Sequence, residues 1–182
     1  MKKLTLWDAI YAINMAIACT ISYVLVTELL VGFINHANSV LGGMWAAVAT
    51  IFVFRETREG SVTAGISRLI ATCVSFVLCF IYIALFPVNA AGFGLVIGLG
   101  TIIMMVLGRR GDIVTTGITT AVVLVVAALD TEHALAQPLL RLVDTLVGVA
   151  VGVLFKWLAP YAAAQAGLVS ISGESAGSTT GK

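Results

Sequence analysis

Apolar residues gather in six long segments separated by short polar breaks, and this pattern constrains the fold more than any other feature. A membrane-spanning helix needs about 20 mainly apolar residues, because the hydrocarbon core of a bilayer is about 30 Å thick. Only 10% of the 182 residues are charged, whereas a soluble domain carries about 25%. The chain is therefore predicted to be an all-α integral membrane protein with six transmembrane helices. The six segments are Leu6–Val31, Val40–Phe54, Ala64–Phe86, Ala90–Leu107, Ile113–Leu129 and Leu139–Leu158.

The composition changes after Pro160, and this change marks a boundary between two regions. Residues 1–160 contain all six apolar segments and are predicted to form one transmembrane domain. Residues 161–182 are rich in Ala, Gly and Ser, and a segment of that composition cannot bury a core. We expect residues 161–182 to form a flexible cytoplasmic tail.

Lys and Arg are distributed unevenly between the two sides of the predicted helices. Cytoplasmic loops carry an excess of these residues in membrane proteins. If the N-terminus is cytoplasmic, every Lys and Arg except Arg141 falls on the cytoplasmic side. We therefore predict a multi-pass protein of the cell inner (plasma) membrane, with both termini in the cytoplasm. The cytoplasmic set is Lys2, Lys3, Arg55, Arg58, Arg68, Arg109, Arg110, Lys156 and Lys182.

The third and sixth segments match each other at an offset of 73 residues. The matched pairs are Arg68 with Arg141, Thr72 with Thr145, and Pro87 with Pro160. A repeated unit with three spans must lie upside down relative to its twin, which is the architecture of many transporters. We predict two inverted three-helix repeats, over about residues 4–87 and 90–160.

The two equivalent arginines are the first candidates for a substrate pathway. Ionisable groups inside the hydrocarbon are costly, so they usually face the bundle interior or an aqueous cavity. Inversion places Arg68 toward the cytoplasmic mouth and Arg141 toward the outer one. Cationic groups at both ends of one route suit an organic anion, which arginine grips through two parallel hydrogen bonds. Thr72 and Thr145 project from the same helix faces as these arginines.

Other polar residues complete the candidate set, and several have a structural interpretation as well. Asp144 follows Arg141 at i+3, so the two can form a structural ion pair. Arg68 can anchor its helix by reaching the inner headgroups. Asn14 is costly to bury, which favours a place in the pathway. Trp45 either lines the pathway or packs against its neighbours.

Several classes of function have no support in the sequence. Motifs of metalloproteases and serine hydrolases are missing, so we expect no enzymatic activity and no cofactor. The three cysteines lie in apolar runs without metal-ligand spacing, so no metal site is predicted. A net charge of +1 gives no field that would attract nucleic acid.

Two motifs resemble those of the fusaric acid resistance family, within the aromatic acid exporter superfamily that includes plant aluminium-activated malate transporters. One is the tryptophan-bearing stretch 44–48 followed by Arg68-Leu69-x-x-Thr72, and the other is the second copy at 141–145. This resemblance implies passage of small organic anions, aromatic acids among them, through the lipid bilayer. It also implies basic residues along the path and a homodimer as the working unit.

Two questions remain open at this point. Gly148 and Gly152 form a GxxxG pattern, which suits close helix contact either within one protomer or between two. The main alternative function is a non-transporting membrane scaffold or accessory subunit, since no carboxylate is clearly placed for ion coupling.

The predicted orientation can be tested by cysteine labelling in a variant that lacks the three native cysteines. Because the basic residues set the orientation, Glu59→Cys and Gly111→Cys should react with a membrane-impermeant thiol reagent only from the cytoplasmic side. Glu132→Cys should react only from outside. Labelling of Glu59→Cys and Glu132→Cys from the same side would contradict both the orientation and the inversion.

Overall fold

The computed structural model of the chain describes residues 6–30, 36–55 and 57–165. The described residues form six α-helices and one short 3-10 helix, η1, so the predicted all-α class is confirmed. The elements are α1 (Leu6–Leu30), α2 (His36–Val53), α3 (Arg58–Leu85), α4 (Ala90–Val106), η1 (Arg110–Asp112), α5 (Ile113–Leu129) and α6 (Ala136–Gln165).

Four of these helices contain stretches that are long and apolar enough to cross a bilayer. The stretches are Asp8–Glu28, Arg58–Leu85, Arg110–Leu129 and Ala136–Leu158. The helices α2 and α4 are apolar but shorter, at 18 and 17 residues. At a rise of 1.5 Å per residue they are about 26 Å long, slightly less than the hydrocarbon thickness. The chain is therefore a multi-pass membrane protein.

Three helices, α2, α3 and α6, begin earlier than their apolar segments, and local chemistry explains the starts of α3 and α6. The Thr57 hydroxyl caps α3 by accepting a hydrogen bond from the Gly60 backbone N–H (3.0 Å), so α3 includes the polar turn before Ala64. Pro138 lies in the first turn of α6, where a proline is tolerated because its missing N–H would have no helical partner.

The end of α6 differs from the predicted domain boundary. The helix continues through Pro160 to Gln165, so residues 161–165 are helical rather than part of the predicted tail. Three consecutive alanines at 162–164 explain the extension, since alanine has the highest helix propensity. The rest of the predicted tail, 166–182, lies outside the described residues, as does part of the predicted turn at 32–39.

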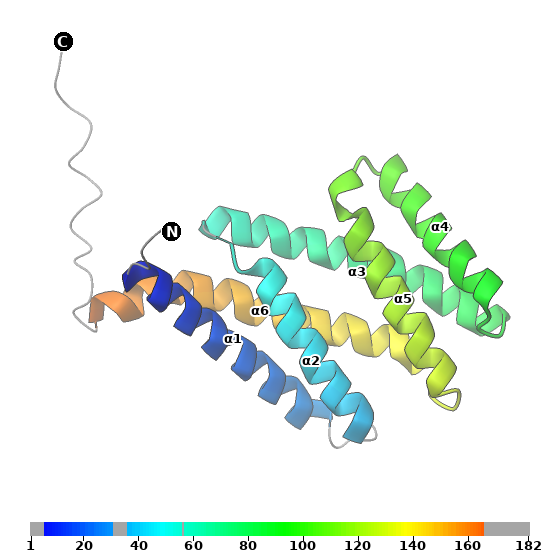
Figure 1. Cartoon of the computed structure of the whole chain (residues 1–182), viewed down its shortest axis with the longest axis horizontal. Helices are drawn as coiled ribbons and strands as arrows, with labels where there is room; N and C mark the ends of the chain where they lie inside the picture. Colours follow the sequence, from blue (N-terminus) through cyan, green and yellow to red (C-terminus); the bar gives the residue numbers. More distant parts are fainter. Residues whose placement is uncertain (1–5, 31–35, 56, 166–182) are drawn as a thin grey trace, which may run out of the picture.

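The helices are arranged as two hairpins on a central pair of long helices (Figure 1). The long helices α3 and α6 pack against each other and run in opposite directions (Figure 1). The α1–α2 hairpin packs on α6, and the α4–α5 hairpin packs on α3. Each hairpin therefore lies mainly against the long helix from the other half of the chain.

The two hairpins contact the long helices at matching positions. The Thr50 hydroxyl of α2 donates to the Gly148 carbonyl of α6 (2.9 Å), and the Thr120 hydroxyl of α5 donates to Ser75 Oγ of α3 (3.1 Å). Ser75 and Gly148 are separated by the same 73-residue offset that aligns the two arginines. A threonine therefore joins each hairpin to an equivalent place on a long helix.

Glycines on α6 allow α2 to approach it closely. A Cβ at Gly148 would collide with the Ala46 carbonyl and lie 2.8 Å from the Ala49 Cβ. A Cβ at Gly152 would lie 3.2 Å from the Thr50 carbonyl oxygen. The GxxxG pattern thus packs against a helix of the same chain, and this contact resolves the first question left open by the sequence.

This packing predicts that Gly148→Ala destabilises the protein. The added methyl group must separate α2 from α6, and overpacking of this kind costs about 1–3 kcal/mol. Unfolding in a detergent titration should show the loss. Gly98→Ala on α4 is the control, because a Cβ there meets nothing within 4 Å. Equal stability of the two variants would contradict the close α2–α6 contact.

Candidate functional site

Arg68 lies inside the bundle, on the face of α3 that is turned toward α2. Its side chain is only 2% exposed, which argues against an anchor at the headgroups. The guanidinium carbon lies 4.6 Å from the centre of the Phe52 ring and 5.4 Å from the Trp45 ring. Among the described residues, none of its three guanidinium nitrogens has a hydrogen-bond partner. A buried cation in this state can accept an anion without breaking a bond.

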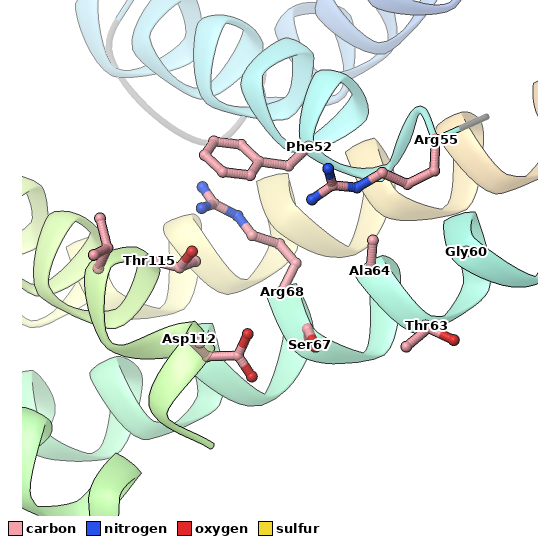
Figure 2. A pocket seen from close by; sticks show the side chains of 11 residues that line it. Phe52, Arg55, Gly60, Thr63, Ala64, Ser67, Arg68, Asp112 and Thr115 are labelled. Atoms are coloured by element: carbon pink, nitrogen blue, oxygen red, sulfur yellow. The ribbon is translucent and has the colours of Figure 1, made fainter. Parts of the chain in front are cut away.

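The Arg68 side chain borders a cavity of about 630 Å³ between the end of α2, the start of α3 and the start of α5 (Figure 2). We call this end of the bundle the Arg68 end. The cavity is lined by Phe52, Arg55, Gly60, Thr63, Ala64, Ser67, Arg68, Gly111, Asp112, Val114 and Thr115. Its volume falls in the range of about 300–1,000 Å³ that is typical of small-molecule sites.

The charges around the cavity favour an anion. The guanidinium groups of Arg55 and Arg68 point into the same space (Figure 2). Asp112 is the acidic residue among the lining residues, and Arg109 Nε pairs with its carboxylate at 2.8 Å. Arg109 also donates to Ser67 Oγ (2.7 Å), which ties the start of α5 to α3. With Asp112 neutralised, Arg55 and Arg68 make the cavity cationic.

A second cavity, between α4 and α5, has a different character. Its volume is about 430 Å³, and it is bordered by Val88, Asn89, Ala90, Phe93, Leu124, Val125, Ala128 and Leu129. None of these side chains carries a charge. The cavity at Arg68 is therefore the better candidate for an anion site.

Arg141 is buried at the opposite end of the bundle, which we call the Arg141 end, where α5 ends and α2 and α6 begin. Its Nη1 lies 3.0 Å from the Asp144 carboxylate, as the i, i+3 spacing predicts, and donates to the Leu41 carbonyl (3.3 Å). Arg141 and Asp144 are 1% and 0% exposed. Leu41 and Phe52 are about 16 Å apart along α2, so the two arginines are well separated.

Polar side chains join three helices at the Arg141 end. The Asn38 amide of α2 donates to the carboxylate of Asp130, at the end of α5 (2.8 Å), and Gln137 of α6 donates to Asn38 (3.4 Å). The His133 ring contacts the same carboxylate (3.1 Å). The bond from Asn38, followed by the contacts with His133, lowers the pKa of the Asp130 carboxyl. These bonds join α2, α5 and α6 at the Arg141 end.

The remaining candidates from the sequence lie away from the cavity. The hydroxyls of Thr72 and Thr145 donate to the carbonyls of Arg68 (2.9 Å) and Arg141 (2.8 Å), one turn back on their own helices. Asn14 is half-buried on α1 and is not among the residues that line the cavity. Of the candidates named from the sequence, Trp45 is the one whose ring lies beside the Arg68 guanidinium.

Sequence reasoning missed several residues of this site. Phe52, Ser67 and Asp112 come from three different helical elements, and no fixed spacing links them. Asp112 belongs to a short charged turn between α4 and α5, and charge alone does not mark such a turn as part of a site. The described residues contain no cluster of three or more His, Cys, Asp or Glu that could hold a metal ion.

The family model described as fusaric acid resistance protein-like matches residues 18–155. The chain matches no curated protein and no solved structure.

The buried pair predicts a specific pattern of stabilities. Arg141→Gln should lower the free energy of unfolding by about 3–5 kcal/mol, because the Asp144 carboxylate remains buried without its partner. The double variant Arg141→Gln, Asp144→Asn should recover most of this loss. Thermal unfolding of the four proteins of the cycle measures the coupling. Additive effects of the two substitutions would contradict the pairing.

Proposed function

The chain belongs to the fusaric acid resistance protein-like family, and from this premise we propose that it exports organic acid anions through the membrane. Aromatic acids are the favoured substrates. Arg68 is the group that receives the anion, Trp45 supports it, and Arg141 with Asp144 lies further along the path.

One observation supports this proposal more than any other: the Arg68 guanidinium is buried, borders the cavity, and has no hydrogen-bond partner among the described residues. Burial of a cation is costly unless a counter-charge compensates it. A carboxylate from the cavity would supply both the charge and two parallel hydrogen bonds. A transported carboxylate would bind Arg68 and then dissociate, which explains why the described part of the chain supplies no permanent counter-charge.

The surroundings of Arg68 favour an acid with an aromatic ring. The Phe52 ring packs on the guanidinium at 4.6 Å and also borders the cavity. A ring attached to a bound carboxylate would extend into the space beside Phe52, where aromatic pairs are stabilised by offset or edge-to-face contact. Ser67 and Thr115 offer hydroxyls for ring substituents.

The proposed architecture is two inverted repeats, with six spanning helices and with both termini in the cytoplasm. It is supported by the antiparallel α3 and α6, the matching helix contacts, and the equivalent positions of Ser75 and Gly148. In this orientation the Arg68 cavity faces the cytoplasm, where an exporter collects its substrate. We propose a homodimer in the inner membrane as the working unit, by analogy with the family.

Flux of benzoate from liposomes that contain only this protein tests the function. Arg68→Gln should lower the flux about tenfold or more, because hydrogen bonds to a charged group contribute about 1.5–3 kcal/mol. Arg68→Lys should retain an intermediate flux, since an ammonium keeps the charge but cannot grip a carboxylate with a fork.

The control is Arg110→Gln, because Arg110 is exposed and does not line the cavity. It should transport at the wild-type rate. A folded Arg68→Gln variant with normal flux would exclude Arg68 from the pathway. A wild-type protein without flux for any organic acid would favour the scaffold or accessory subunit instead.

A further inference from the structure

The two equivalent arginines have different partners. Arg68 has no hydrogen-bond partner among the described residues and borders an open cavity. Arg141 already contacts a carboxylate, that of Asp144, at 3.0 Å. Of these two arginines, Arg68 has no counter-ion among the described residues, and Arg141 has one supplied by the chain.

The difference traces to a single pair of equivalent positions. The 73-residue offset that matches Arg68 with Arg141 also matches Ala71 with Asp144. Both side chains are 0% exposed, and both lie three residues after their arginine, on the same helix face. The carboxylate of Asp144 is thus what distinguishes the surroundings of Arg141 from those of Arg68.

The contact between Arg141 and Asp144 leaves bonding capacity unused. Neither carboxylate oxygen has a hydrogen bond of good geometry among the described residues, and neither do Arg141 Nε and Nη2. A guanidinium that grips a carboxylate fully would form two parallel bonds. The pair is therefore held by charge and one short contact, so another carboxylate can compete for the same nitrogens.

We propose that Asp144 is a built-in competitor of the transported carboxylate, which makes Arg141 a second anion station of lower affinity than Arg68. This inference rests on the proposed function, because it needs an anion that reaches Arg141. An anion that binds there shares the Arg141 guanidinium with Asp144, and the negative charge of the Asp144 carboxylate weakens its binding. Binding is therefore tight at the Arg68 end and weak at the Arg141 end, which favours release at the Arg141 end.

Substitutions at the two equivalent positions, Asp144 and Ala71, test the proposal. Binding of radiolabelled benzoate is measured by equilibrium dialysis on the whole protein in lipid nanodiscs. Asp144→Asn and Asp144→Ala should tighten binding at Arg141 by about tenfold or more, since the competing charge is removed. The gain should disappear when Arg141→Gln is added.

The reciprocal change is made beside Arg68. Ala71→Asp should weaken benzoate binding at Arg68 by about tenfold or more, because the new carboxylate competes for the guanidinium. Ala71→Asn is the matched control, since it adds nearly the same volume without the charge. Thermal unfolding checks that each variant is folded.

The outcomes separate this inference from the proposed function. If wild type binds no benzoate while Asp144→Asn gains an Arg141-dependent site, Arg68 is not a station but the competition at Arg141 stands. A folded Asp144→Asn protein without any gain overturns the competition. If neither Asp144 variant folds, the two Ala71 variants provide the test. Equal benzoate affinities of Ala71→Asp and Ala71→Asn would then overturn the competition.

Discussion

A guanidinium group inside a bilayer must be compensated, and this constraint organises the interior of the bundle. At Arg141 the compensation comes from the carboxylate of Asp144 and the Leu41 carbonyl. At Arg68 it comes from two aromatic faces and a cavity, which leaves the hydrogen-bonding capacity of the group unused. Arginine is therefore paired within the chain at position 141 and left without a hydrogen-bond partner among the described residues at position 68, and the neighbouring residues determine the difference.

Most other polar residues in the bundle are used for packing. The hydroxyls of Thr72, Thr116 and Thr145 each donate to a carbonyl four residues earlier, as is common for threonine in membrane helices. Thr50 goes further and bridges α2 to α6 where Gly148 permits close approach. These hydroxyls are satisfied inside the bundle, whereas all three guanidinium nitrogens of Arg68 lack a hydrogen-bond partner among the described residues.

The sequence predicted the helical class and the Arg141–Asp144 pair, because hydropathy and i, i+3 spacing are local signals. Helix starts were less accurate, since the Thr57 cap and Pro138 act through hydrogen bonding rather than hydropathy. The contact of Trp45 with Arg68 was not predicted, because it depends on how α2 packs against α3. Phe52 and Asp112 could not be found, because their place beside Arg68 depends on how separate helices pack.

The difference between the two ends of the bundle is encoded at equivalent positions. At the Arg141 end His133 and Gln137 take part in the hydrogen bonds that join α2, α5 and α6. The 73-residue offset matches them with Gly60 and Ala64, which line the open cavity. Side chains this small cannot form such bonds, and the Arg68 end has a cavity at the equivalent positions. Under the proposed function an anion in this cavity neutralises the repulsion between Arg55 and Arg68, so the missing side-chain bonds leave room for the substrate.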